Sequence, residues 1–188
     1  ASGLTDAHGN LIVQGNGVTG FLGTLTYAVR SVIDKFGSNL YPGDIVITND
    51  PYSGGGTHLS DVTLVMPIFH KGRLVAFAAN KAHWTEVGGM APGSWTTDST
   101  DVWQEGIQFP CIKLYIKGEV VPGLIDLIRA NVRTPDMSIG DMNAQAASLR
   151  LAELRYIELC ERYGVDTVLH GVESLLDYGE ELTRQALK

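Results

Sequence analysis

Apolar residues recur at two different spacings along the chain, and the spacing changes near residue 121. Before this point, short apolar runs bounded by glycine, proline, asparagine or aspartate predict β-strands. After it, apolar residues recur every three or four positions, which predicts helices. The runs that predict strands lie within residues 1–14, 44–50, 58–69, 73–84 and 111–121.

One helix is predicted among the strands, over residues 21–36, because its apolar side chains share one helical face and Gly37 follows as a stop. Further helices are predicted over residues 124–132, 139–163 and 165–187. In the last two helices one apolar stripe each is expected to pack inward. These stripes consist of Met142, Leu149, Ala152, Tyr156, Leu159 and Tyr163, and of Val165, Val168, Val172, Leu175, Leu176 and Leu182.

This order of elements predicts an α+β fold. A mixed β-sheet with hairpins occupies the first two thirds, and a helical layer follows at the C-terminal end. Residues 1–121 are then mainly strands and active-site loops, and residues 122–188 are helical.

The segments 58–69 and 73–84 predict a hairpin whose register decides which side chains share a face. Residues 70–72, His-Lys-Gly, fit a three-residue loop that ends in a glycine with positive φ. In that register Asp61 faces Lys81, and His83 is its diagonal neighbour on the same face, roughly 7–8 Å away at the backbone. A two-residue turn would instead place Asp61 and His83 on opposite faces of the sheet.

His58 follows the glycine run 54–56 and lies three positions before Asp61. A regular strand would turn His58 to the other face, but the glycines allow the chain to curl and bring the imidazole back. His58, Asp61 and His83 then form a set of two imidazoles and one carboxylate, which leaves open positions on a divalent metal ion. These ligand types suit Mn, Fe, Ni or Zn. The alternative is that all three are hydrogen-bonded structural residues.

Residues 86–106 are rich in Gly, Ser, Thr and Trp and show no clear period, which predicts a long loop. A loop of this length in a compact domain is commonly functional. Glu86 and Glu105 are the candidate catalytic residues in it, as groups that transfer protons. The alternative for Glu86 is an exposed loop acid without a role in the reaction.

Other residues near this loop leave alternatives open. Asp50 is either a further ligand or a turn cap, and Lys81 forms a simple ion pair with Asp61 in the register above. Trp84, Trp95 and Trp103 either wall an apolar substrate pocket or form a small core under the loop.

Composition narrows the possible partners. The net charge is −7, which argues against nucleic acid or an anionic membrane as a partner. No apolar run approaches the length of a membrane span. Cys111 and Cys160 lie far apart in apolar surroundings, which is typical of buried free thiols in a reducing compartment, so a cytoplasmic location is expected.

Four segments resemble the hydantoinase B/oxoprolinase family. They are "PGDIVITNDPYSGGGTHLSDVTLVMPIF", "LVAFAANKAHWTEVGGMAPGS", "QEGIQFPCIKL" and "NVRTPDMSIGDMNAQAASLR". The resemblance runs from about residue 3 to about residue 165 and so covers most of the chain. Family chains are longer, and this one lacks a starting methionine, so we expect residues 1–188 to be the N-proximal portion of a larger subunit.

The resemblance implies a metal-bearing subunit in a hetero-oligomer. The family's ligands fall on His58, Asp61 and His83, and a further acidic ligand is expected before residue 1. The implied cofactors are a divalent metal (Mn, Zn or Fe) and ATP, which a hydantoinase A-like partner subunit uses to phosphorylate a carbonyl or amide oxygen.

Trp84 and Glu86 stand where many hydantoinase-like members have His and Asp, so the chain resembles the acetone and acetophenone carboxylase branch. That branch implies an ATP-dependent ketone carboxylase in which the metal stabilises an enolate for attack on CO₂ and Glu86 or Glu105 transfers a proton. The alternative is ATP-dependent hydrolysis of a cyclic amide, as in hydantoinases, oxoprolinases and lactamases. A second alternative is a scaffold subunit without catalytic function.

Overall fold

The structure is a computed structural model that describes residues 1–188, except for the side chains of residues 19 and 22. The strands are β1 (Ser2–Asp6), β2 (Leu11–Gln14), β3 (Ile45–Thr48), β4 (Asp61–His70), β5 (Arg73–His83), β6 (Ile112–Ile116) and β7 (Glu119–Val120). The helices are α1 (Thr19–Phe36), α2 (Pro122–Asn131), α3 (Pro135–Tyr163) and α4 (Val165–Ala186), with a 3₁₀ turn at Val102–Gln104. The α+β prediction and its C-terminal helices are confirmed.

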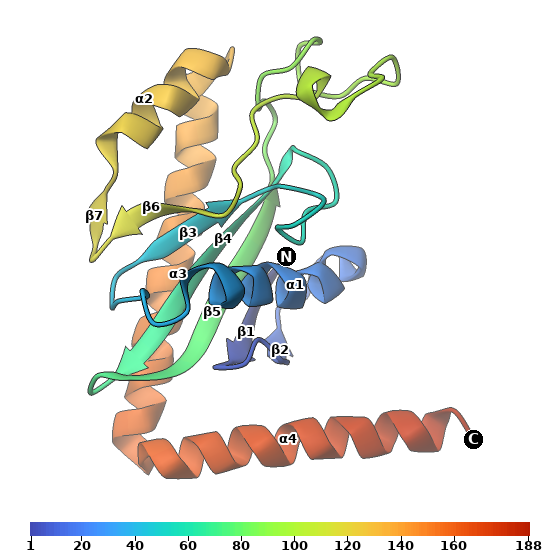
Figure 1. Cartoon of the computed structure of the whole chain (residues 1–188). Coiled ribbons are helices and arrows are strands. Elements are labelled where there is room, and N and C mark those ends of the chain that lie inside the picture. The colour runs from blue at the N-terminus through green and yellow to red at the C-terminus, as the bar shows by residue number, and fades with distance from the viewer.

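The strands form one seven-stranded sheet in the order β2-β1-β5-β4-β3-β6-β7, with antiparallel pairing throughout. Helix α1 covers one face, and α3 runs across the other (Figure 1). Alternate β4 side chains therefore serve two cores: Leu64 packs with Leu149 of α3, and Val65 packs with Val29 of α1. This two-sided cover explains why β4 reads as a nearly continuous apolar run.

The predicted stripes of the last two helices are only partly confirmed. Met142, Leu149 and Tyr156 of α3 are buried, but Leu159 is 47% exposed and Tyr163 is 53% exposed. None of the described α4 side chains is buried. The inward stripe predicted for α4 is therefore wrong at Leu175 and Leu182, which are 49% and 46% exposed. This helix packs on the end of α3 and on strand β2, and Asp166 near its start pairs with Arg73 of β5. It extends away from the sheet, below these elements (Figure 1).

The β4–β5 hairpin differs from prediction in two ways, each of which shifts the pairing by one residue in the same direction. The turn has two residues, Lys71 and Gly72, both with positive φ, so His70 pairs with Arg73. A β-bulge then leaves Val75 without a partner, because Phe69 pairs with Leu74 and Ile68 pairs with Ala76.

The extra residue moves the register by one, and Asp61 pairs directly with His83. The predicted three-residue loop and the predicted Asp61–Lys81 pair are wrong, but the prediction that Asp61 and His83 share a face is confirmed.

Among the described residues, none of the helices is long and apolar enough to cross a lipid bilayer.

Candidate metal centre

His58, Asp61 and His83 meet at the end of the β4–β5 hairpin. The Nε2 atom of His58 lies 3.3 Å from Oδ1 of Asp61, and Nδ1 of His83 lies 3.2 Å from the same oxygen. One ligand atom from each of the three residues lies within 4.8 Å of the others. The glycine run therefore brings His58 to the face that Asp61 and His83 share, as the sequence predicted.

The surroundings of Asp61 fit a bound cation. Its side chain is fully buried at 0% exposure, and a buried carboxylate is costly unless opposite charge and hydrogen bonds compensate it. One oxygen faces the two imidazoles, and the other accepts a hydrogen bond from the Thr57 hydroxyl, which fixes the orientation of the carboxylate. The two imidazoles remain partly exposed, His58 at 27% and His83 at 47%, so the open side of the set faces solvent.

Residues 49–60, which we call the glycine loop, carry His58 to this position by packing directly on α1. Gly55 has φ +69°, and a Cβ there would lie 2.5 Å from the backbone nitrogen of Ala28 and 2.9 Å from the carbonyl of Thr24. Only glycine allows this approach.

The side chain of Asn49 holds the two ends of the glycine loop together by hydrogen bonds. Its amide nitrogen donates to the carbonyls of Leu59 (2.7 Å) and Ile107 (2.9 Å), and its oxygen accepts from the backbone amide of Phe109 (2.7 Å). This fully buried side chain therefore joins the glycine loop to the segment that precedes β6. No local sequence pattern singles out Asn49 for this role.

Lys81 of strand β5 binds the glycine loop to the sheet. Its ammonium donates to the carbonyl of Gly55 (2.9 Å) and to Oγ1 of Thr24 (2.5 Å), so the simple ion pair predicted with Asp61 is replaced by these contacts. Burial lowers the pKa of Lys81, and the nearby charge of Asp61 opposes that shift.

A small cavity of about 210 Å³ adjoins the three candidate ligands. Its walls are His58, Ser94, Trp95, Thr96 and Glu105. The indole of Trp95 lies edge-on to the ring of His58, with centroids 5.2 Å apart and planes at 88°, and its centroid is 6.4 Å from that of His83. Glu105 thus lines this cavity, and its role in proton transfer stays a prediction.

Glu86 does not line this cavity. It is 3% exposed, so the alternative of an exposed loop acid is wrong, and its carboxylate is occupied by hydrogen bonds within the loop. Burial raises the pKa of Glu86, but hydrogen bonds from two backbone amides, a hydroxyl and Arg133 outweigh burial and hold the pKa below its usual value. Asp50 accepts from the backbone amide of Tyr52 and the hydroxyl of Ser53, which is the turn-cap alternative.

The three tryptophans do not form one pocket. Trp84 is fully buried in the main core, where its indole nitrogen donates to Gln145 of α3 at 2.7 Å and its ring packs against Phe109. Trp103 is 79% exposed. Trp95 is the one of the three that walls the cavity, and no feature of the sequence separates it from the other two.

Comparison with known proteins places the chain in a family. The model of the hydantoinase B/oxoprolinase family matches residues 1–188. A putative D-/L-hydantoinase subunit of a Pseudomonas species is 37% identical over 161 residues, which are 85% of this chain and 27% of that protein. The acetophenone carboxylase delta subunit of Aromatoleum aromaticum is 28% identical over 95% of this chain and 27% of that protein.

The crystal structure of the ATP-dependent caprolactamase from Pseudomonas jessenii is also similar, with a TM-score of 0.93 and 34% identity. The similarity covers 99% of this chain and 32% of the caprolactamase chain. The present chain therefore spans about a third of the length of such relatives or less. Since the family model matches every residue, the chain belongs to the hydantoinase B/oxoprolinase family.

Proposed function

We propose that this chain holds a divalent cation with His58, Asp61 and His83, and that the protein containing it hydrolyses a cyclic amide at the expense of ATP. The observation that carries the proposal is the meeting of two imidazoles and one fully buried carboxylate beside a 210 Å³ cavity. A cyclic amide is favoured because the named hydantoinase subunit and the caprolactamase are 37% and 34% identical to this chain, against 28% for the carboxylase subunit.

Each residue of the centre has a distinct role in this proposal. A divalent cation such as Mn, Zn or Fe supplies Lewis-acid polarisation of an oxygen atom of the substrate or of water. His58 and His83 hold it with neutral nitrogens, and Asp61 contributes the negative charge. Trp95 limits the access of water on one side of the cavity, and Glu105 accepts a proton from the attacking water.

ATP enters through a partner in this proposal. A hydantoinase A-like subunit phosphorylates the amide oxygen, which makes the carbonyl carbon easier to attack, and the hetero-oligomer brings the product to the cavity. Support for a multi-subunit assembly comes from the relatives that are themselves named as subunits.

Ketone carboxylation is the second candidate, and the acetophenone carboxylase delta subunit among the relatives favours it. The two residues that suggested this branch, Trp84 and Glu86, lie in the core and inside the loop, and neither lines the cavity. Their identity therefore bears on packing more directly than on the choice of substrate. The same three ligands would serve both reactions.

The test uses the full-length protein purified with its ATP-using subunit. ADP release is measured with a hydantoin or lactam in the absence of bicarbonate, and with a ketone in its presence. Lactam-dependent ADP release with ring opening supports the proposal, and release that requires ketone plus bicarbonate supports the second candidate. Asp61→Asn should abolish either activity. A wild-type protein with only trace metal and neither activity would support the scaffold alternative.

A further inference from the structure

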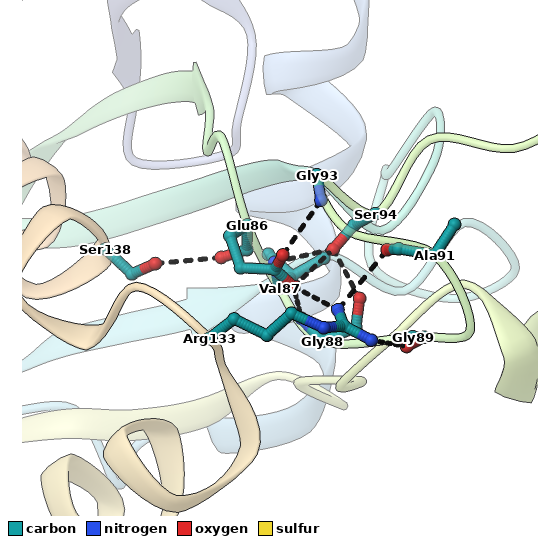
Figure 2. Close-up of polar contacts among 9 residues, drawn as sticks. All are labelled: Glu86, Val87, Gly88, Gly89, Ala91, Gly93, Ser94, Arg133 and Ser138. Carbon is teal, nitrogen blue, oxygen red and sulfur yellow. Dashed lines mark hydrogen bonds and ion pairs between the residues drawn. The ribbon is translucent and has the colours of Figure 1, made fainter.

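The carboxylate of Glu86 is surrounded by donors from several segments. Its Oε1 atom accepts from the backbone amide of Gly88 at 2.7 Å and from Arg133 at 3.0 Å. Its Oε2 atom accepts from the amide of Gly93 at 2.9 Å. The hydroxyl of Ser94 lies 3.0 Å from Oε1 and also contacts the carbonyl of Gly88 (Figure 2). The carboxylate thus closes residues 86–94 into a ring around itself.

Arg133 fastens this ring to the helices. It lies between α2 and α3, and beside its contact with Glu86 it donates to the carbonyls of Gly89 at 2.6 Å and Ala91 at 3.3 Å (Figure 2). At the start of α3, the hydroxyl of Ser138 donates to the backbone carbonyl of Glu86 at 2.8 Å. Two side chains from the helical part of the chain therefore hold Glu86, one at its carboxylate and one at its backbone carbonyl.

The ring ends directly before Trp95. Ser94 is buried and has φ +54°, a left-handed conformation that is unfavourable for a residue with a side chain and persists only where the surroundings impose it. Its hydroxyl also accepts from the backbone amide of Val87 at 2.8 Å. Trp95 is 68% exposed, so the packing of its own ring restrains it weakly, and the backbone at Ser94 sets the position from which its side chain extends.

We propose that Glu86 and Arg133 are positioning residues that hold Trp95 over His58 and His83, and so set the shape of the cavity beside the cation. This positioning role depends on the proposed function in one respect, which is that the cavity is taken as the substrate site. Glu86 acts here as a permanent hydrogen-bond acceptor, not as a group that exchanges protons with a substrate. Of the two glutamates in the long loop, this leaves Glu105 as the one that lines the cavity.

The test compares Arg133→Met with Arg129→Met in the full-length protein and its ATP-using subunit. Each change removes one half-exposed arginine that pairs with one carboxylate. The partner of Arg133 is the buried Glu86, whereas the partner of Arg129 is the exposed Asp136. The emission of Trp95 is isolated as the difference between each protein and its Trp95→Phe counterpart. Two signals are recorded: quenching of that emission by acrylamide, and quenching by one equivalent of bound Co²⁺.

Arg133→Met should still bind one equivalent of Co²⁺, while Co²⁺ quenches Trp95 less and acrylamide quenches it more than in the wild type. Its kcat/KM should fall about tenfold, because small displacements of a cavity wall are costly for the reaction. Arg133→Lys should remain close to Arg133→Met, since one ammonium cannot replace a planar guanidinium that reaches three acceptors. Arg129→Met should match the wild type in every signal.

The proposal is overturned if both quenching signals of Arg133→Met equal those of Arg129→Met. It is also overturned if Trp95 moves while kcat/KM stays unchanged. Should the wild type bind no Co²⁺, the proposed function fails, and acrylamide quenching of Trp95 alone still decides whether Arg133 positions the indole. Thermal unfolding of each variant separates a displaced loop from an unfolded protein.

Discussion

The glycine loop, residues 49–60, and the long loop, residues 84–111, reach the same three ligands but are held by different chemistry. The carbonyls of the glycine loop accept hydrogen bonds from Asn49, which directly follows β3, and from Lys81 of β5. In the long loop, the carboxylate of Glu86 accepts from backbone amides, and its cationic partner comes from the helical part. The glycine loop carries the candidate ligand His58, and the long loop carries the other residues of the cavity wall.

This difference separates two properties of the site. Damage to the anchors of the glycine loop should change how tightly a cation is held, because His58 moves with the loop. Damage to the anchors of the long loop should change what the cavity accepts, because Trp95 and Glu105 move while the ligands stay in place. Substitutions at the anchors and at the ligands test that separation.

The largest effect is expected at Asp61, which follows the glycine loop and pairs with His83, the residue before the long loop. Replacing it with asparagine, Asp61→Asn, removes the negative charge and should lower cation affinity by more than about 100-fold, since even groups that only orient a ligand are worth about 10–100-fold. Competition with a chelator measures the affinity. Asp50→Asn is the matched control, because that acid lies in the same loop and caps a turn. Equal affinity in both variants would contradict the assignment of Asp61 as a ligand.

Asn49→Ala should destabilise the fold by about 3 kcal/mol, because it leaves buried carbonyls and an amide without partners. Urea denaturation measures the loss, and cation affinity should fall with it. Asn131→Ala serves as the control, since that side chain donates to a carbonyl within the exposed end of α2. A stability loss with unchanged cation affinity would show that the glycine loop keeps His58 in place without Asn49.

Gly55→Ala should cost about 1–3 kcal/mol, because φ +69° and the contact with the backbone of α1 leave no place for a methyl group. Gly140→Ala is the matched change in open space on α3 and should stabilise the protein by about 0.5–1 kcal/mol. Thermal unfolding compares the two. If Gly55→Ala were as stable as the wild type, the close packing of the glycine loop on α1 would not be needed to place His58.

Much of this arrangement follows from the sequence, and the exceptions have physical reasons. The sequence predicts the shared face of Asp61 and His83, although the turn is one residue shorter than expected and a bulge at Val75 shifts the pairing by one residue more. Together the shorter turn and the bulge shift the register by two residues. Because side chains alternate faces with a period of two, Asp61 and His83 still share a face although the predicted register is wrong. A bulge leaves little trace in a hydrophobic pattern, because the strand is buried on both faces.

The exceptions concern contacts between distant segments. A helical stripe shows which side of α4 is apolar but not what covers it, and Leu175 and Leu182 are exposed here. Glu86 lies near His83 in sequence, which made it a candidate for the reaction. Its surroundings depend on Arg133, which is 47 residues away, and no local pattern reports such a partner.

The smallest expected effect distinguishes the two loops by pH. The pKa of Glu86 is lowered below 4.5 in the folded protein, so its carboxylate stabilises the fold above that pH, and this contribution is lost as pH falls through the folded-state pKa. Glu86→Gln removes the titrating group, so its unfolding midpoint in urea should fall less steeply than that of the wild type below about pH 4.5. Asn49→Ala should keep the wild-type slope, because its amide does not titrate. Equal slopes in the wild type and Glu86→Gln would mean that the long loop does not depend on this carboxylate, and the contrast between the two loops would then rest on Arg133 alone.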